Sequence, residues 1–227
     1  MTSSAILIPA RYNSTRFPGK PLAMLDGVPM IKRVYDACSA SNIPTYVLTD
    51  DERIANVFTN TSVLIDYYPY ENGTERCAGA LKQDYMDKYD NFINVQGDMP
   101  DVNVTMIEQC LQWLADYPIS TVWTDMPADM QKDPDSVKMV RAGDQALWFG
   151  RGMTGYGHWH LGIYGYRREA LELYHDLEIT VEEETEKLEQ LRWLKSGWQI
   201  GCSHVYFKGT EINSPEDVDI WHQQNSQ

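Results

Sequence analysis

Three cations follow the first hydrophobic run of the chain. Arg11, Arg16 and Lys20 lie on one loop, residues 9–20, and Gly19 lets the backbone of this loop approach a ligand closely. Three cations on one loop suit a triphosphate, because its charge must be neutralised and its leaving pyrophosphate stabilised. The loop lacks the GxxxxGK[ST] pattern of a Walker A motif. From composition alone, a solvated basic loop is the alternative interpretation, since charged side chains are mostly exposed.

A lone carboxylate ends a second hydrophobic run. Asp98 follows NVQG, residues 94–97, and precedes Met99 and Pro100. A carboxylate oxygen is the hard ligand that Mg²⁺ prefers, and Mg²⁺ commonly bridges one or two carboxylates and the phosphates of a substrate. The position therefore predicts a magnesium ligand in the same crevice as the basic loop. An aspartate in an ordinary Gly-Asp turn is the alternative.

A third motif, GTER at residues 73–76, opens an expected helix. Glycine and the first turn of a helix offer free backbone N–H groups, which can bind a phosphate or the edge of a base. An ordinary helix cap explains the same residues. The motif alone does not distinguish these two interpretations.

The elements that must position these motifs alternate along the first half of the chain. Strands are expected at residues 5–9, 45–48, 62–65 and 92–95, and helices at residues 30–39, 51–58, 74–86 and 104–114. This rhythm predicts an α/β fold, with an open, mostly parallel sheet flanked by helices. Ligands of such sheets bind beyond the carboxyl ends of the strands, where the basic loop and Asp98 both lie.

The pattern changes after about residue 119. Extended segments are expected at residues 120–124, 136–141, 145–149 and 161–166, with a hairpin around residues 142–144. Helices are expected at 168–174 and 185–195, then a strand at 198–202 and a helix at 215–223. No repeat or flexible linker interrupts the chain. We therefore expect residues 1–227 to form a single domain with a small inserted β-rich lobe at about 120–167.

Bulk composition restricts the class of partner. A formal net charge of −14 over 227 residues opposes binding to nucleic acid or to an anionic membrane surface. The four cysteines show no CxxC or Cys/His spacing, so we expect them to be reduced. The N-terminus lacks a signal-peptide pattern, and no apolar run approaches the roughly 20 residues that span a bilayer. These features favour a cytoplasmic protein without nucleic-acid or membrane partners.

Residues 8–22, IPARYNSTRFPGKPL, resemble the signature loop of the CMP-sugar synthetases. Within these enzymes they are most similar to the 3-deoxy-manno-octulosonate (Kdo) cytidylyltransferases. Five further segments match in the family's order: GTER (73–76), NVQGD (94–98), HLGIYGYR (160–167), LEQLR (188–192) and SPED (214–217). Together the six segments span nearly the whole chain, which makes a chance agreement very improbable.

The resemblance implies a Rossmann-like nucleotide-diphospho-sugar transferase fold and a reaction between CTP and a sugar acid. The anomeric hydroxyl of the sugar attacks the α-phosphate of CTP, pyrophosphate leaves, and no covalent enzyme intermediate is expected. The catalytic residues would be Arg11, Lys20 and Asp98, with Asp98 binding Mg²⁺. The nucleotide-binding residues would be Pro9, Ala10, Arg11, Arg16, Lys20, Thr74, Arg76 and Gln96.

The resemblance places the sugar acid on the later segments. The sugar-binding residues would be Gln96, Arg151, His160, Tyr164, Glu189 and Gln190. Strand packing is the alternative for Tyr164, and a structural role is the alternative for His160. A solvated helix face is the alternative for Glu189 and Gln190. The family also implies a homodimer, with residues 161–166 near its interface.

Three departures from the family concern the metal and the sugar. Asn213 stands where the family carries an aspartate that is a second metal ligand, and an amide binds Mg²⁺ without adding charge. The loop at residues 150–159 is shorter and richer in glycine than its counterpart, and that counterpart approaches the sugar. Asn72 and Met99 replace the family's serine and glutamate in two motifs.

These departures leave more than one function open. The leading one is a cytidylyltransferase for Kdo or a close relative, and the nearest alternative accepts an amino-Kdo or a nonulosonic acid. A CTP-binding homologue with weakened catalysis would explain Asn213. A glycosyltransferase can use a similar sheet, but Asp98 stands outside any DxD-type metal motif.

Overall fold

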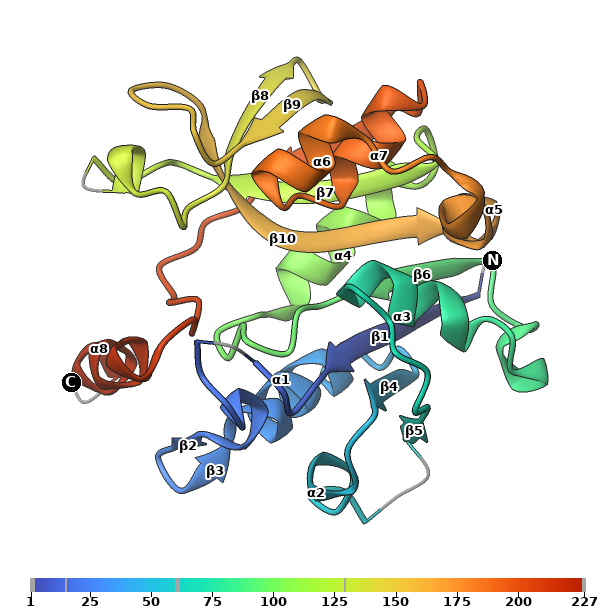
Figure 1. Cartoon of the computed structure of the whole chain (residues 1–227), viewed down its shortest axis with the longest axis vertical. Coiled ribbons are helices and arrows are strands. Elements are labelled where there is room, and N and C mark those ends of the chain that lie inside the picture. The colour runs from blue at the N-terminus through green and yellow to red at the C-terminus, as the bar shows by residue number, and fades with distance from the viewer. Residues whose placement is uncertain (1–2, 15, 60–61, 129, 226–227) are drawn as a thin grey trace.

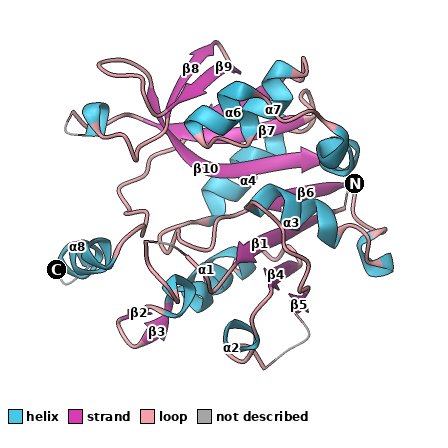
Figure 2. Ribbon diagram, in the orientation of Figure 1, coloured by secondary structure: helices cyan, strands magenta, loops and turns pink. Residues whose placement is uncertain are grey.

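The computed structural model describes residues 3–14, 16–59, 62–128 and 130–225 (Figures 1 and 2). Within these residues one nine-stranded sheet runs through the molecule, and helices pack against both of its faces. Its strands, in spatial order, are β5 (Val63–Ile65), β4 (Thr45–Thr49), β1 (Ser4–Ala10), β6 (Asn91–Asn94), β10 (His158–Arg167), β7 (Ile119–Thr124), β11 (Ile200–His204), β9 (Gln145–Gly150) and β8 (Lys138–Ala142). A separate ribbon consists of β2 (Met24–Leu25) and β3 (Val28–Pro29). The α-helices are α1 (Met30–Ser39), α2 (Glu52–Ala55), α3 (Gly73–Ala80), α4 (Val104–Trp113), α5 (Arg168–Glu172), α6 (Val181–Glu186), α7 (Gln190–Lys195) and α8 (Pro215–Asn225).

Strand β1 is the centre of the parallel half of the sheet. It pairs in parallel with β4 and β6, and β4 pairs in parallel with β5. Successive side chains of a strand point to opposite faces, so Ile6 and Ile8 pack toward α1 and α4, whereas Leu7 packs toward α3. Burial on both faces explains the continuous apolar run and confirms the expected α/β class.

The other half of the sheet is mixed. β10 is antiparallel to β6 and β7, β11 is parallel to β7, and the hairpin β8–β9 completes the edge. The register of β10 shifts between His160 and Tyr164, where Gly162 adopts a φ of 67°. Residues 120–167 thus contribute to the same sheet, and their role as a lobe stays a prediction. Leu161 and Tyr166 are buried within the chain, so they offer no exposed surface to a dimer partner.

Some helices are shorter than the sequence predicts. α2 ends at Ala55, and the helix expected at 74–86 divides into α3 and a 3₁₀ turn, Asp84–Met86. The single helix expected at 185–195 is wrong, because α6 and α7 are separate. Lys187 ends α6 in the left-handed conformation, with a φ of 55°. The junction that results, residues 187–190, contributes to the lining of two adjoining cavities.

A buried ion pair joins α6 to α7. Arg192 donates two hydrogen bonds to the carboxylate of Glu183, at 2.8 and 2.6 Å, and both side chains are buried. The guanidinium carbon also lies 4.1 Å from the ring centroid of Tyr174. Trp193 stacks on Tyr166 with a centroid separation of 4.9 Å. These contacts fix the position of α7 on the core.

Helix α8 reaches back to the N-terminal third of the chain. Its Trp221 packs in a small core with Leu25 and Met30. Asp217, in the first turn of this helix, accepts a hydrogen bond from the backbone N–H of Ser214 at 2.8 Å. These contacts of α8 also anchor one end of the segment 205–214, which joins β11 to α8 (Figure 1).

Candidate functional site

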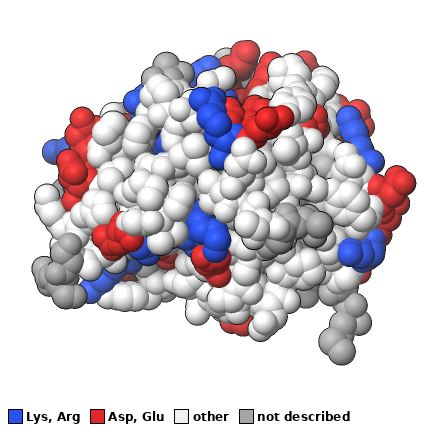
Figure 3. Space-filling model, turned by 90° about the horizontal axis from the view of Figure 1, so that it is seen from below, with Lys and Arg blue, Asp and Glu red and all other residues white. Residues whose placement is uncertain are grey.

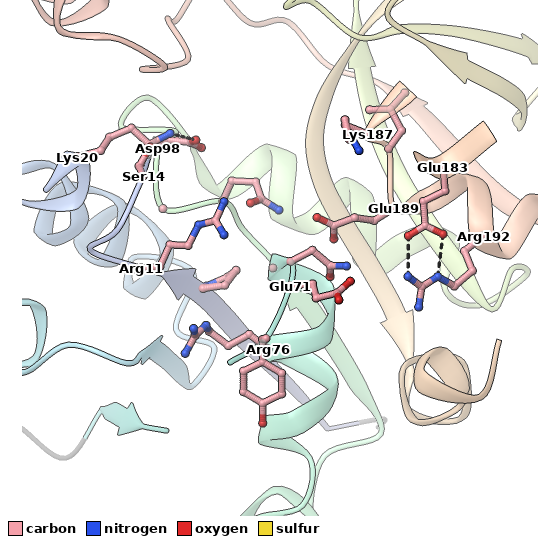
Figure 4. A pocket seen from close by; sticks show the side chains of 18 of the residues that line it. Arg11, Ser14, Lys20, Glu71, Arg76, Asp98, Glu183, Lys187, Glu189 and Arg192 are labelled. Atoms are coloured by element: carbon pink, nitrogen blue, oxygen red, sulfur yellow. Dashed lines mark hydrogen bonds and ion pairs between the residues drawn. The ribbon is translucent and has the colours of Figure 1, made fainter. Parts of the chain in front are cut away.

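Two adjoining cavities open where β1 and β6 end. The larger has a volume of about 550 Å³ and the smaller about 190 Å³. The residues that line both are Gln96, Asp98, Lys187, Leu188 and Glu189. Figure 4 shows the larger cavity between Lys20 and Asp98 on one side and Glu183, Lys187 and Arg192 on the other. Through the shared residues, a ligand in one cavity can meet a ligand in the other.

The basic loop forms one wall of the larger cavity. The predicted nucleotide-binding residues that line it are Pro9, Ala10, Arg11, Lys20, Arg76 and Gln96. The guanidinium of Arg11 makes no hydrogen bond or ion pair with the residues that the structure describes. Lys20 donates a hydrogen bond to Asp98 Oδ2 at 2.6 Å, and both side chains are partly buried. The structure therefore brings Asp98 to the basic loop, while the roles of these residues stay predictions.

The backbone before Lys20 explains how this lysine reaches Asp98. Gly19 adopts a φ of 74°, a left-handed conformation that favours glycine, and a 3₁₀ turn (Lys20–Leu22) begins directly after it. A Cβ atom at Gly19 would lie 3.2 Å from the ring of Tyr12. A larger residue at this position would be both strained and crowded, so the glycine fixes the turn that presents the lysine.

The third motif caps its own helix. The side chain of Asn72 accepts a hydrogen bond from the N–H of Glu75 at 2.8 Å. The N–H of Thr74 donates to Glu189 Oε2 at 3.0 Å. Protein groups thus occupy the first turn of α3, which favours the helix-cap interpretation. Thr74 is buried and is not among the described residues that line the two cavities.

Two of the predicted nucleotide-binding arginines pair with carboxylates. Arg76 donates to Asp50 at 2.7 Å, and Arg16 donates to Asp135 at 2.9 Å. Arg16 lines the smaller cavity, in contrast to the other cations of the basic loop. A nucleotide contact by either arginine requires it to share or leave its carboxylate partner.

All the predicted sugar-binding residues line the smaller cavity: Gln96, Arg151, His160, Tyr164, Glu189 and Gln190. The guanidinium of Arg151 donates to the backbone carbonyls of Asp135 and Glu186. Among the described residues, no carboxylate side chain pairs with this guanidinium. Its positive charge is therefore available to an anionic group of a substrate.

His160 is a buried and neutral side chain. Its Nε2 lies 2.9 Å from Thr121 Oγ1, and that hydroxyl donates to the carbonyl of Ile163 at 2.7 Å. The histidine nitrogen must therefore be the donor, which leaves Nδ1 with a lone pair. Burial, and then the nearby charge of Arg151, lowers the pKa of His160 to about 3. A neutral imidazole with an acceptor nitrogen suits a sugar hydroxyl better than a carboxylate.

Glu189 and Gln190 do not lie on a solvated helix face. Gln190 is buried, and its Nε2 has no hydrogen-bond partner among the described residues. Burial raises the pKa of Glu189, although the hydrogen bond from Thr74 opposes this shift. Tyr164 is buried in β10, where burial raises the pKa of its hydroxyl well above the usual range. Gln190 thus supplies an unsatisfied donor at the wall of the smaller cavity.

The donor set around Asp98 fits a hard cation. Asp98 and Asn213 line the smaller cavity with oxygen-bearing side chains. Among the described residues, no group of three or more His, Cys, Asp or Glu side chains is arranged to hold a metal ion by itself. Mg²⁺ commonly binds through one or two carboxylates and completes its shell with water and substrate phosphates, so these residues fit a shared site of that kind.

Sequence reasoning missed Lys187 and Glu211. Lys187 lines both cavities because of the left-handed break after α6, which no sequence pattern indicated. Burial, and then the charge of Asp98, raises the pKa of Glu211 to about 8. The ionised carboxylate is disfavoured until a cation lies beside it. Glu211 is two residues from Asn213, and this closeness in the sequence to a predicted metal ligand was the available signal.

The surface carries acidic and basic side chains in mixture. On the face shown in Figure 3, Lys and Arg side chains lie next to Asp and Glu side chains, without a continuous basic band. No helix within the described residues has the length and apolar character needed to cross a membrane.

Comparisons with known sequences agree with this architecture. Residues 5–200 match the family model described as cytidylyltransferase. The chain is 37% identical over 233 residues to a Shewanella halifaxensis protein named 8-amino-3,8-dideoxy-manno-octulosonate cytidylyltransferase, and 95% of each chain is covered. A Shewanella oneidensis protein of the same name is also 37% identical, with 94% of each chain covered.

Solved structures show the same likeness. A CMP:2-keto-3-deoxy-manno-octonic acid synthetase complexed with CTP has a TM-score of 0.90 and 31% identity, covering 100% of this chain and 99% of the other. A 4-diphosphocytidyl-2C-methyl-D-erythritol synthase from Anaerococcus prevotii has a TM-score of 0.69 at 12% identity, with 100% and 99% covered. The second likeness shows the fold alone.

Proposed function

The chain belongs to the cytidylyltransferase family, and we propose that it joins CTP to a 2-keto-3-deoxy octulosonate, giving the CMP-sugar and pyrophosphate. The observation that carries this proposal is the pair of adjoining cavities, which share Gln96 and Asp98. The basic loop lies at one cavity, and Arg151 and His160 lie at the other. The relatives that carry an 8-amino sugar in their names favour an aminated octulosonate over Kdo itself.

The larger cavity takes CTP in this proposal. Arg11 has no described protein partner and lines this cavity, so it supplies an uncompensated positive charge to the phosphates. Lys20 lies at the end that adjoins the smaller cavity, beside Asp98. The triphosphate would thus lie near the junction of the two cavities, and the cytosine base would lie near Ala10 and Arg76.

The smaller cavity takes the sugar acid. The guanidinium of Arg151 pairs with the sugar carboxylate. Nδ1 of His160 accepts a hydrogen bond from a sugar hydroxyl, and Nε2 of Gln190 donates one to a sugar oxygen. Since the donor of Gln190 is buried without a partner, a bound sugar oxygen would remove an unsatisfied polar group.

The reacting groups meet at the junction of the cavities. The anomeric oxygen of the sugar attacks the α-phosphorus, and a new P–O bond forms while the hydroxyl proton is released. The bond from the α-phosphorus to its bridging oxygen breaks, and pyrophosphate leaves with the electron pair. Arg11 and Lys20 stabilise the charge that develops on the departing phosphates. Binding both substrates side by side makes the attack effectively intramolecular.

We also propose that Mg²⁺ assists this reaction. Asp98 would hold it, and Asn213 would contribute its amide oxygen. When bound, Mg²⁺ would neutralise phosphate charge and polarise the α-phosphate. Asp98 already pairs with Lys20, so the lysine is placed to take a phosphate oxygen when the carboxylate engages the metal.

A substrate panel tests the proposal. Pyrophosphate release is measured with CTP, UTP, ATP or GTP and with Kdo, 8-amino-Kdo or a nonulosonic acid, in the presence and absence of Mg²⁺. We expect release that requires CTP, an octulosonate and Mg²⁺ together. Tight CTP binding without turnover for every sugar acid would instead indicate a binding protein. Sugar transfer from a preformed nucleotide donor would indicate a glycosyltransferase.

The resemblance also supports a cytoplasmic homodimer, which we propose as the working form. Light scattering on the purified protein tests this assembly, with a mass of twice the 26.1 kDa chain expected. A monomer that turns over at the full rate would show that the dimer is not needed for activity.

A further inference from the structure

Glu211 places a carboxylate in the smaller cavity without a protein partner. The residue lines that cavity together with Arg151, His160 and Tyr164. Among the residues that the structure describes, its carboxylate makes no hydrogen bond and no ion pair. A partly buried carboxylate in this state is unfavourable, because it has lost water without gaining a hydrogen-bond donor or a cation in direct contact. A ligand that supplies the missing partner would explain why the carboxylate lies there.

The backbone holds Glu211 in this position. Residues 209–213 belong to no helix or strand, but Glu211 and Asn213 line the smaller cavity, whereas Ile212 packs in the small core with Trp221. Ile212 is fully buried, and its N–H donates to the carbonyl of Asp98 at 3.1 Å. The N–H of Thr210 donates to Asp101 at 3.0 Å. Glu211 is therefore fixed against the loop that carries Asp98.

The other carboxylates of the smaller cavity are satisfied by protein groups. Asp98 pairs with Lys20 at 2.6 Å, and Asp135 pairs with Arg16 at 2.9 Å. Glu189 accepts the backbone N–H of Thr74 at 3.0 Å. Glu211 is the exception among the described residues that line this cavity. The arrangement leaves one carboxyl group, that of Glu211, without a hydrogen-bond partner in the space that receives the sugar.

A free carboxylate is an unfavourable neighbour for a simple sugar acid. The proposed substrate brings its own carboxylate, and CTP brings a triphosphate beside it, so a further negative charge repels both. The repulsion turns into attraction if the sugar also carries a cation. A protonated primary amine supplies such a charge and three N–H donors, which suit a carboxylate acceptor.

We propose that Glu211 is a specificity-determining residue that binds the ammonium group of an aminated 2-keto-3-deoxy sugar acid. This inference rests on the proposed function. In the pyranose form of an octulosonate, the ring oxygen is bonded to both the anomeric carbon and the carbon that carries the two-carbon tail. An amine at the end of that tail therefore lies close to the reacting centre. Glu211, fixed against the Asp98 loop, is in the right region to meet it.

Two substrates and four proteins test the inference. The kcat/KM values for 8-amino-Kdo and for Kdo are measured with wild type, Glu211→Gln, Glu211→Asp and the control Glu108→Gln, an exposed carboxylate on α4. Wild type and the control are expected to prefer the amino sugar. Glu211→Gln should lower kcat/KM for the amino sugar about 10- to 100-fold, the loss of one charged hydrogen bond. It should leave kcat/KM for Kdo equal or higher. Glu211→Asp, which keeps the charge, should retain a preference for the amine.

The readouts separate this inference from its rivals. An equal loss for both sugars in Glu211→Gln, with a higher Mg²⁺ requirement and weaker Mn²⁺ binding by electron paramagnetic resonance, would make Glu211 a metal ligand and overturn the inference. A wild-type enzyme that prefers Kdo would overturn it as well. No turnover of either sugar by the folded wild type would count against the proposed function instead. Thermal unfolding of each variant excludes misfolding as the cause.

Discussion

At the scale of single residues, Asp98 and Lys20 set the charge at the junction of the two cavities. Their ion pair, at 2.6 Å, is partly buried, so water screens it less than a surface pair. From residue types and a family resemblance, the sequence predicted Lys20 as a phosphate-binding residue and Asp98 as a magnesium ligand. It could not show that they touch, because the contact joins positions 78 residues apart along the chain. The same limit hid Glu211, which no motif marks.

We expect Asp98→Asn to lower kcat by about 10²- to 10³-fold, the usual effect of removing one preorganised electrostatic group. The fold should persist, because the side chain is partly exposed and isosteric with asparagine. Pyrophosphate release and thermal unfolding measure the two effects. Asp116→Asn, on an exposed turn after α4, is the control that should change neither. A variant that turns over normally would remove Asp98 from the mechanism.

Asn213→Asp should lower the Mg²⁺ concentration that gives the half-maximal rate. The change adds a carboxylate to the wall that Asp98 and Glu211 already line, and a charged oxygen binds Mg²⁺ more strongly than an amide. Titration of the rate with Mg²⁺ measures the shift. Asn56→Asp, exposed at the end of α2, should leave the curve unchanged. If both variants resemble wild type, Asn213 does not face the metal.

His160 makes the stability of the protein depend on pH. Its pKa is about 3 in the folded chain and about 6.5 when unfolded, so the unfolded chain binds the proton first as the pH falls. The contribution is complete above pH 6.5 and is lost as the pH falls toward 3. At pH 5 the loss is about 2 kcal/mol in the free energy of unfolding. Urea unfolding at pH 7.5 and 5 should show this extra loss in wild type relative to His160→Gln. Equal losses would mean that His160 is not buried as a neutral ring.

At the scale of elements, the parallel half of the fold follows from the sequence, and the break between α6 and α7 does not. β1, β4 and β6 are buried on both faces, so their central residues are consecutive apolar ones, a pattern that differs from the amphipathic helices between them. The stretch TEKLEQLRWLK, in contrast, has a helical composition throughout. Only packing decides that Lys187 leaves the helix, because Leu188, Leu191 and Trp193 are all buried in the same core.

The ion pair Arg192–Glu183 should stabilise the packing of α6 against α7, and these two helices carry one wall of the larger cavity. Arg192→Leu leaves the carboxylate of Glu183 buried without its partner, which we expect to lower the free energy of unfolding by about 3–5 kcal/mol. Glu172→Ala, which breaks an exposed pair on α5, should cost only about 0.3–0.5 kcal/mol. Urea unfolding compares the two variants with wild type. Similar, small changes in both would show that the buried pair does not stabilise this region.

At the scale of the whole molecule, an acidic chain presents local cations to an anionic ligand. The net charge of −14 opposes the approach of CTP, whereas Arg11 and Lys20, which line the larger cavity at one edge of the sheet, would attract it in the proposed site. The fold makes this possible because strands that are parallel bring their carboxyl ends, and the loops after them, to the same edge. The sugar side comes from more distant parts of the chain, so a family resemblance was needed to find it.

The attack of the sugar oxygen on the α-phosphorus is tested most directly by an isotope label. The octulosonate is labelled with ¹⁸O at its anomeric oxygen, reacted with CTP and Mg²⁺, and the product is examined by phosphorus NMR and mass spectrometry. We predict that the label is retained in the bridge between the sugar and phosphorus of the CMP-sugar, with one pyrophosphate released per product. Loss of the label from the bridge would mean that the carbon–oxygen bond breaks instead, which would contradict the mechanism.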